Sequence, residues 1–136
     1  MKTHTLSHVA VSVPPGTLTD DYRNEVLTFY GELLGWREIE DLRLPDRLTI
    51  AIGPACYLNL RERSDAMTAT GYEHFGVLVR SPEDLDQVWD ELHTKYPDVN
   101  VEPQSTTDGG HRTFRFFHLL PLAVEIQYFP DVAPHA

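Results

Sequence analysis

The chain has little cysteine and little positive charge. Its 136 residues include one cysteine, Cys56, which excludes a disulfide within the chain and predicts a reducing, cytoplasmic location. Lysine and arginine number 11 against 21 aspartates and glutamates, giving a formal net charge of −10. Because nucleic acids and anionic membranes are bound by basic surfaces, this balance argues against both as partners.

The sequence also lacks long apolar runs. None is long enough to span a bilayer, and no basic segment followed by an apolar one begins at Met1, so we expect neither a membrane anchor nor a secretory leader. Hydrophobic residues make up 41% and charged residues 24%, which is the composition of a globular protein. The length fits a single domain, residues 1–136, with its own core.

Two segments with the same alternating pattern stand half the chain apart. Residues 72–79 predict a strand with one wholly apolar face and with His74 on the other face. Residues 7–13 repeat this pattern, with His8 opposite a row of valines. The two histidines are 66 positions apart in a chain of 136, which suggests a duplicated unit.

Both halves of the chain predict the order strand, helix, strand, strand, strand. The first half places these elements at residues 7–13, 21–34, 36–40, 47–52 and 55–62, with a turn at 41–46. The second places them at 72–79, 82–96, 99–102, 113–117 and 122–129, with a polar loop at 104–112. The prediction is an α+β fold of two tandem βαβββ modules, at about 5–63 and 71–130.

Four of the predicted strands, at corresponding places in the two halves, carry a polar side chain opposite their apolar face. These side chains are His8, Asn59, His74 and Glu125. A carboxylate in the middle of a half-buried strand is unusual unless it is paired or liganded. If the two sheets curve around a shared cleft, the four side chains converge there. Two imidazoles and one carboxylate form a facial triad with open positions, so we expect His8, His74 and Glu125 to bind a divalent metal.

The residues that carry this pattern resemble the vicinal oxygen chelate superfamily. That superfamily groups glyoxalase I, bleomycin-resistance proteins, fosfomycin-resistance enzymes, methylmalonyl-CoA epimerase and extradiol dioxygenases. The resemblance covers most of the chain through LSHVAVSV, EVLTFYGELLGW, YLNL, GYEHFGVLV, SPEDLDQVWDEL and VEIQYF, in that order. It implies a curved mixed sheet around a metal cleft, helices on the outer face, and His8, His74 and Glu125 as metal ligands. It also implies a homodimer in which modules pair across subunits.

The sequence departs from the family pattern at three places. Asn59 stands where glyoxalase I and the epimerase carry a ligand Glu or Gln, so a hydrogen bond to substrate suits it better than ligation. Residues 118–121 replace the usual Asp-Pro-Asp-Gly turn, and Ala10 replaces a threonine that fosfomycin enzymes carry.

Further side chains are candidates for the site. His111 follows two glycines on the predicted loop and is a candidate acid–base group, although an exposed loop histidine fits the same pattern. Tyr57, Arg61 and Gln127 share the predicted cleft face and are candidate substrate contacts, as solvated strand positions also are. Glu125 and Asn59 join His111 as candidate catalytic residues.

Two functions of different classes fit the sequence. The first is a metal-dependent lyase, isomerase or dioxygenase whose single divalent ion (Fe²⁺, Zn²⁺, Ni²⁺ or Mn²⁺) binds two oxygens of a small organic substrate. The second is a metal-free binding protein of the bleomycin-resistance type, for which the acidic chain would suit a cationic ligand. A family member with a purely structural metal is a third alternative.

Overall fold

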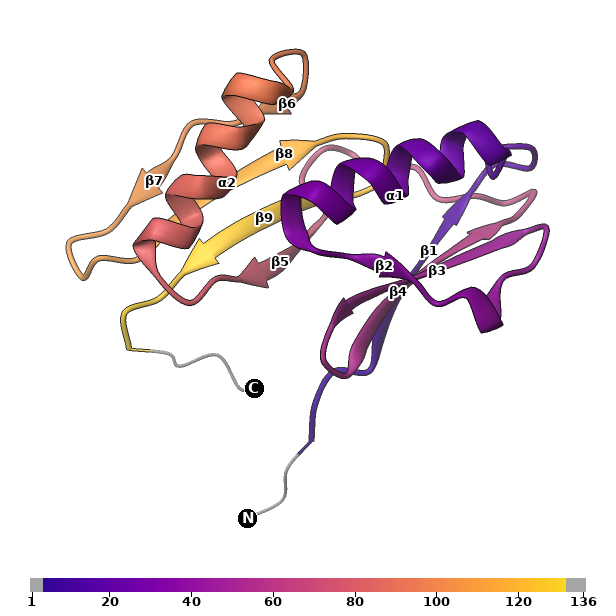
Figure 1. Ribbon diagram of the computed structural model, residues 1–136, viewed down its shortest axis with the longest axis horizontal. Coiled ribbons are helices and arrows are strands. Elements are labelled where there is room, and N and C mark those ends of the chain that lie inside the picture. Colours follow the sequence, from indigo (N-terminus) through magenta and orange to yellow (C-terminus); the bar gives the residue numbers. More distant parts are fainter. Residues whose placement is uncertain (1–3, 132–136) are drawn as a thin grey trace. The chain divides into compact units, whose positions relative to one another are not determined.

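The computed structural model describes residues 4–131, which form two compact units along the chain (Figure 1). The first unit is Met1–Thr68 and the second is Ala69–Ala136. Each strand pairs only with strands of its own unit among the described residues. No helix in residues 4–131 has the length and apolar character needed to cross a bilayer.

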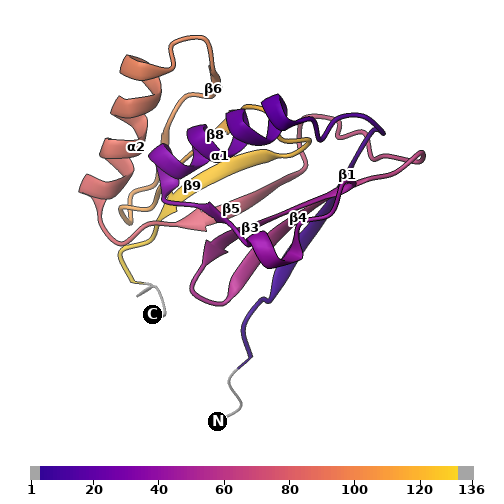
Figure 2. The same ribbon diagram turned by 45° about the vertical axis from the view of Figure 1, so that its right-hand side comes forward.

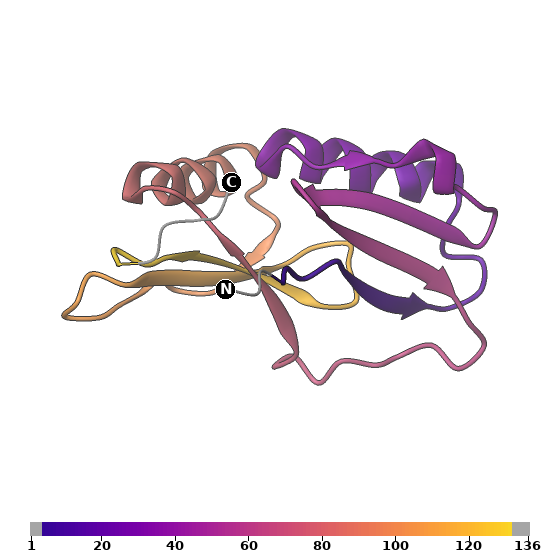
Figure 3. The same cartoon turned by 90° about the horizontal axis from the view of Figure 1, so that it is seen from below.

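The first unit is a mixed four-stranded sheet with one helix on one face (Figure 3). The strand order is β1-β4-β3-β2, in which β1 runs parallel to β4 and the other pairs are antiparallel. The elements are β1 (His8–Val13), α1 (Asp20–Leu34), β2 (Arg37–Glu38), the 3₁₀ helix η1 (Glu40–Leu42), β3 (Arg47–Gly53) and β4 (Cys56–Glu62). The core of this unit includes Val11, Val26, Phe29, Tyr30, Leu48, Ile50, Leu58 and Leu60.

The ends of α1 follow from its sequence. The Thr19 side chain caps the first turn by accepting from the Tyr22 amide at 3.1 Å. Gly35 ends the helix with φ 73°, in the left-handed region, and donates to the Gly31 carbonyl at 3.0 Å. The C-terminal end is where the sequence predicts it, and the helix begins at Asp20, one residue before the predicted start, because Thr19 is the cap.

A buried arginine, Arg23, fastens α1 to the turn before β3. Its side chain lies in the apolar stripe of the helix, where the residue is only 5% exposed. The guanidinium donates to four backbone carbonyls at 2.7–3.2 Å, those of Leu18, Leu44, Pro45 and Arg47. Every nitrogen of the guanidinium therefore has a partner, which offsets the desolvation of the charge. The sequence analysis did not predict this role.

The second unit has a mixed five-stranded sheet with one helix on one face (Figure 2). The strand order is β5-β9-β8-β6, with β7 paired to β8, and β5 runs parallel to β9. The elements are β5 (His74–Leu78), α2 (Pro82–Lys95), β6 (Asn100–Val101), β7 (Ser105–Thr106), β8 (Arg112–Phe117) and β9 (Ala123–Tyr128). The core of this unit includes Leu85, Val88, Leu92, Phe114, Phe116, Val124 and Ile126.

The two units repeat one strand register, which confirms the duplication that the sequence predicts. His8 pairs with Tyr57 and His74 pairs with Ala123, each 49 positions further along the chain. Two residues on, Ala10 pairs with Asn59 and Gly76 with Glu125. His8 thus corresponds to His74, and Asn59 corresponds to Glu125. The predicted α+β fold of two βαβββ modules is confirmed, with an additional short strand in the second module.

Element boundaries differ from the prediction in the second unit at β5 and β7. Strand β5 begins at His74 and not at Tyr72, because the same register would place Tyr72 opposite Pro121, which has no N–H to donate. The polar segment 104–112 was predicted as loop but contains β7, which pairs with the start of β8. Its turn depends on Gly110 at φ 85° and not on apolar alternation.

In the first unit, β2 covers two residues of the predicted strand 36–40, and the predicted turn 41–46 overlaps η1 (Glu40–Leu42). The pairing of β2 with β3 is limited to Arg37 opposite Ala51 and Glu38 opposite Ile50. The chain then turns into η1, so the ladder stops there.

Candidate functional site

A pocket of about 390 Å³ opens on the second unit. Strands β5, β7, β8 and β9 and the segments beside β5 and β6 supply its lining. The side chains that carry chemistry there are Tyr72, His74, Glu102, Thr113, Arg115 and Glu125. The pocket is within the size range of small-molecule sites, and it combines cations, carboxylates and an aromatic ring.

His74 and Glu125 form the centre of this pocket. His74 Nε2 lies 3.1 Å from Glu125 Oε2, and the side chains are 24% and 16% exposed. His74 Nδ1 lies 2.5 Å from the Tyr72 carbonyl oxygen. The Thr113 hydroxyl donates to the other Glu125 oxygen, Oε1, at 2.6 Å. Each side chain is therefore held in place by a hydrogen bond at the atom that does not take part in the His74–Glu125 contact.

The hydrogen bonds of His74 determine which ring nitrogen carries a proton. A carbonyl oxygen only accepts, so the contact with Tyr72 requires a proton on Nδ1. In the neutral ring Nε2 is then an unprotonated acceptor, and it faces a carboxylate oxygen that also only accepts. Two electron pairs at 3.1 Å repel each other unless a positive centre lies between or beside them. A second proton on the ring or a bound cation satisfies this arrangement.

Arg115 lies beside the histidine. Its Nε donates to Glu102 Oε2 at 2.9 Å, which forms a half-buried ion pair. Its Nη1 lies 3.4 Å from both the Tyr72 carbonyl oxygen and His74 Nδ1. Since Nδ1 carries a proton, the contact with His74 is packing and the carbonyl is the acceptor. Arg115 and His74 thus share the carbonyl of Tyr72.

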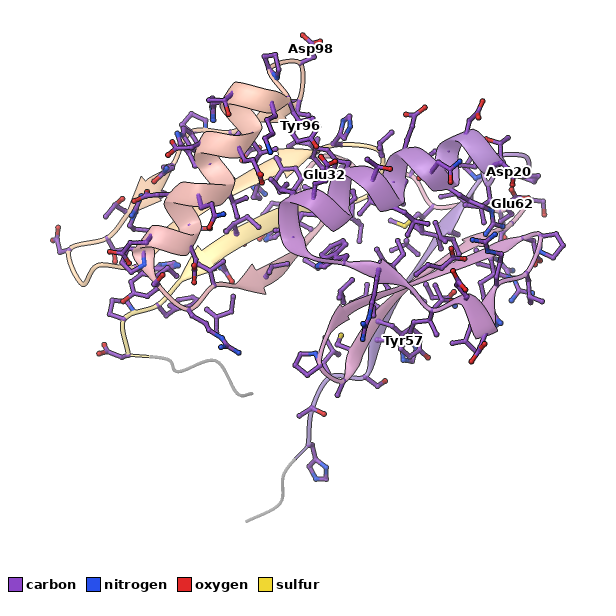
Figure 4. The ribbon with its side chains drawn as sticks, in the orientation of Figure 1. Asp20, Glu32, Tyr57, Glu62, Tyr96 and Asp98 are labelled. Atoms are coloured by element: carbon purple, nitrogen blue, oxygen red, sulfur yellow. The ribbon has the colours of Figure 1, made fainter. Side chains whose placement is uncertain are left out.

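His8 occupies the corresponding position in the first unit. Its Nδ1 lies 2.7 Å from the Ser7 hydroxyl oxygen, so Nε2 is the ring nitrogen without a hydrogen bond among the described residues. The ring stacks on Tyr57 at 4.9 Å with an interplanar angle of 8°, and Tyr57 is labelled on β4 in Figure 4. The side chain is exposed. As in His74, the nitrogen left available is Nε2.

The other candidates of the first unit have partners nearby. The Thr49 hydroxyl donates to Asn59 Oδ1 at 3.3 Å, and Arg61 forms an ion pair with Asp46 at 3.2 Å in which both side chains are 44% exposed. Glu62, at the far end of β4 from Tyr57 (Figure 4), accepts from the Leu18 amide.

Two candidates of the second unit lie on β9 and on the β7–β8 turn. Gln127 covers Gly76, where an added Cβ would lie 2.9 Å from Gln127 Oε1. The ring of His111 stacks on Phe129 at 4.1 Å and 8°, and its buried Nε2 has no hydrogen-bond partner among the described residues. His111 does not line the pocket that holds His74 and Glu125. Its proposed catalytic role stays a prediction.

The structure brings together two of the three predicted metal ligands. Within residues 4–131, no group of three or more His, Cys, Asp and Glu side chains is arranged to hold an ion. His74 and Glu125 lie in contact in the second unit, while His8 belongs to the first unit. The metal triad therefore stays a prediction, of which the second unit supplies a pair.

Four pocket residues were not predicted as site residues: Tyr72, Glu102, Thr113 and Arg115. The sequence pattern does indicate the last two. Phe114 and Phe116 are buried, so alternation along β8 places Thr113 and Arg115 on the opposite face with Glu125. The ion pair of Arg115 is with Glu102, and Glu125 is contacted by His74 and Thr113.

A family model and solved structures match the chain. Residues 5–119 match the model of the Glyoxalase/Bleomycin resistance protein/Dioxygenase superfamily. A fosfomycin resistance protein, FosX, from Listeria monocytogenes in complex with Mn(II) and sulfate is 18% identical, with a TM-score of 0.67 over 93% of this chain and 91% of that one. No curated protein matches the chain.

Two further solved structures show the same fold. A lactoylglutathione lyase from Agrobacterium tumefaciens is 16% identical, with a TM-score of 0.67 over 93% of this chain and 95% of that one. The oxidase ChaP-H2 is 15% identical, with a TM-score of 0.66 over 97% and 98%. At these identities the likeness establishes the fold.

Proposed function

The chain belongs to the Glyoxalase/Bleomycin resistance protein/Dioxygenase superfamily, and on that premise we propose that it is a divalent-metal-dependent enzyme. Its substrate would be a small organic molecule that presents two oxygens to the ion. The single observation that carries this proposal is the contact between His74 Nε2 and Glu125 Oε2 at 3.1 Å. When the imidazole is neutral with its proton on Nδ1, both of these atoms are hydrogen-bond acceptors, and a cation bound by both would stabilise the contact.

The donor set fits a divalent ion. A neutral imidazole and a carboxylate are ligands common to iron, zinc, nickel and manganese sites. The other ring nitrogen of His74 donates to the Tyr72 carbonyl, and the other oxygen of Glu125 accepts from Thr113. Partners of this kind orient metal ligands in proteins, and the carbonyl that accepts from Nδ1 also raises the basicity of the imidazole. His8 is proposed as the third ligand through Nε2.

Each chain residue would have a defined task. An ion bound here would act as a Lewis acid toward the substrate oxygens. Tyr72 and Thr113 hold the His74 ring and the Glu125 carboxylate in place through the hydrogen bonds described above. Asn59 would hydrogen-bond the substrate, and Tyr57, Arg61 and Gln127 would contact it. His111 does not line this pocket and its Nε2 is buried, so an acid–base role for it would require the ring to move away from Phe129.

The reaction class is proposed as lyase, isomerase or dioxygenase. The similar structures include a lyase, an oxidase and a resistance protein crystallised with Mn(II), which supports metal chemistry on this fold without choosing among these classes. Glyoxalase I and methylmalonyl-CoA epimerase carry a ligand Glu or Gln at the position of Asn59, so the reactions of these two enzymes are the least favoured.

Metal analysis of the untagged protein tests this proposal. We expect about one divalent ion per chain in the wild-type protein, retained through gel filtration. His74→Ala is expected to lose it, because one ligand of a small set is removed. The matched control is His93→Ala, which removes an exposed histidine of α2 in the same unit and should leave the metal content unchanged.

The alternative function predicts the opposite result. A metal-free binding protein would show no ion above background, and His74→Ala would then behave like His93→Ala. That outcome would contradict the enzyme proposal and favour sequestration of a cationic ligand, for which the net charge of −10 is suited.

A further inference from the structure

Tyr72, Glu102 and Arg115 line the pocket but are not proposed as metal ligands. They are therefore candidates for contacts with the part of the substrate that does not bind the ion. The following inference rests on the proposed function in one respect, namely that a divalent ion lies at His74 and Glu125.

The guanidinium of Arg115 is only partly used by the protein. It has five N–H donors in a rigid fork. Nε serves Glu102, and Nη1 approaches the Tyr72 carbonyl at 3.4 Å, a long hydrogen bond. Nη2 has no hydrogen-bond partner within residues 4–131. With Nε occupied, the edge formed by Nη1 and Nη2 is the one left for bidentate binding of a carboxylate, and Arg115 lines the pocket.

Tyr72 supplies an aromatic surface next to this edge. The residue is 73% exposed, unlike most large apolar or aromatic residues of the chain. Its ring lies 6.0 Å from the Arg115 guanidinium carbon and meets the His74 ring edge to face at 5.5 Å. Arg115 and His74 both lie beside the Tyr72 ring, and Arg115 Nη1 is 3.4 Å from His74 Nδ1, on the side of the imidazole away from Nε2. A planar ligand at Tyr72 would therefore lie next to the guanidinium and next to the histidine.

The charges of the pocket depend on the ion. With His74 neutral, the pocket holds one cation, Arg115, and two carboxylates, Glu102 and Glu125, so it repels anions. A divalent ion would change the net charge of these groups from negative to positive. An anionic ligand would then be accepted only after the metal, and the two affinities would be coupled reciprocally.

We propose that the pocket of the second unit takes a small planar organic anion, a carboxylate on a conjugated or aromatic frame. The carboxylate binds the Nη1–Nη2 edge of Arg115, the frame packs on Tyr72, and two vicinal oxygens at the opposite end of the frame face the ion. Arg115 is then the residue that determines specificity for the anionic group.

A pair of isosteric probes tests this inference. 3,4-Dihydroxybenzoate and 3,4-dihydroxybenzamide differ in the charge of one substituent, and their binding is measured by calorimetry without oxygen, so that no turnover occurs. We expect the metal-loaded protein to bind the benzoate about 10- to 100-fold more tightly, the range of hydrogen bonds to a charged group. The metal-free protein should show no such preference.

Variants assign the preference to a residue. Arg115→Met should bind both probes equally, and Arg115→Lys should recover only part of the preference because lysine lacks the fork. The matched control is Arg112→Met, which removes an arginine of the same strand whose ion pair is with Asp86 on α2 and which does not line the pocket. Tyr72→Leu should weaken both probes by a similar factor.

The outcomes separate this inference from the proposed function. Metal content is measured in the same samples, so a protein without metal contradicts the proposed function itself. A metal-loaded wild type that binds both probes equally, or a preference that survives Arg115→Met, overturns the anion inference and leaves the metal proposal intact. Should Arg115→Met fail to fold, Arg115→Lys decides, because an undiminished preference for the benzoate in that variant would overturn the inference.

Discussion

At the scale of single residues, His74 and Glu125 already have the arrangement expected of two metal ligands, because they are in contact and each is oriented by a further hydrogen bond. The distal atoms of both side chains are held by Tyr72 and Thr113, and with the ring neutral the facing atoms are two acceptors 3.1 Å apart, an arrangement that a bound cation or a second ring proton satisfies. Glu125 was predicted from its place in an otherwise apolar strand. Its partner Thr113 was not, because a threonine on a strand is common and only the observed register brings it within reach.

Thr113→Val tests the second-layer hydrogen bond. The substitution keeps the shape of the side chain but removes the donor to Glu125 Oε1, so we expect metal affinity to fall about 10- to 100-fold. Competition with a fluorescent chelator measures the change. Thr106→Val, on the exposed strand β7, is the control and should bind metal as the wild type does. Equal affinities for both variants would contradict the role of Thr113.

The single thiol of the chain, Cys56, is partly buried at the start of β4. Burial raises the pKa of the Cys56 thiol, so the reactive thiolate is scarcer at neutral pH than in an ordinary thiol. Alkylation by iodoacetamide at pH 7.5 should be slower in the folded protein than in the protein unfolded by urea. The folded-state rate should rise with pH to a midpoint above the ordinary thiol value. Rates that match in both states would refute this.

At the scale of elements, hydrophobic periodicity predicted both helices and the main strands, since each has one face on a core. The sequence did not predict elements that are held by polar contacts and have no apolar face. Strand β7 has no apolar face and is formed by pairing with β8 and by its turn. Tyr72 looked like the first residue of β5, but Pro121 leaves no donor opposite it. Tyr72 bears on the site all the same, because its carbonyl contacts the His74 ring.

Arg23 is the polar contact that fastens α1 to its sheet. Arg23→Met would leave four carbonyl oxygens without their donor in a buried place, so we expect a loss of about 3 kcal/mol or more in the free energy of unfolding. Arg37→Met, at an exposed position of β2, is expected to change it by less than about 0.5 kcal/mol. Urea denaturation of both variants compares the two losses, and similar values would show that Arg23 is not a structural tie.

At the scale of the whole molecule, the chain is a duplicated unit in which the copies have diverged. The shared register makes Glu125 the counterpart of Asn59, and within residues 4–131 only the second unit combines a histidine and a carboxylate in contact. The residue difference between Asn59 and Glu125 was visible in the sequence. The metal ligand set stays a prediction because its third member, His8, comes from the other unit.

The assembly of the site across subunits is tested by mixing variants. We expect light scattering at micromolar concentration to give twice the 15.5 kDa mass of one chain. A heterodimer of His8→Ala with His74→Ala should bind one ion if each site takes its ligands from both subunits, since one of its two sites then keeps both histidines. If each site lies within one chain, this heterodimer binds none. A monomer mass would contradict the dimer prediction itself.

The most direct test of the account is a crystal structure of the metal-loaded protein with anomalous data collected at the absorption edge of the ion. The account predicts one peak at about 2.0–2.2 Å from His74 Nε2 and from a Glu125 oxygen, with His8 Nε2 as a further ligand and with open positions for substrate. No peak at these atoms, with His74 and Glu125 hydrogen-bonded directly to each other, would contradict it.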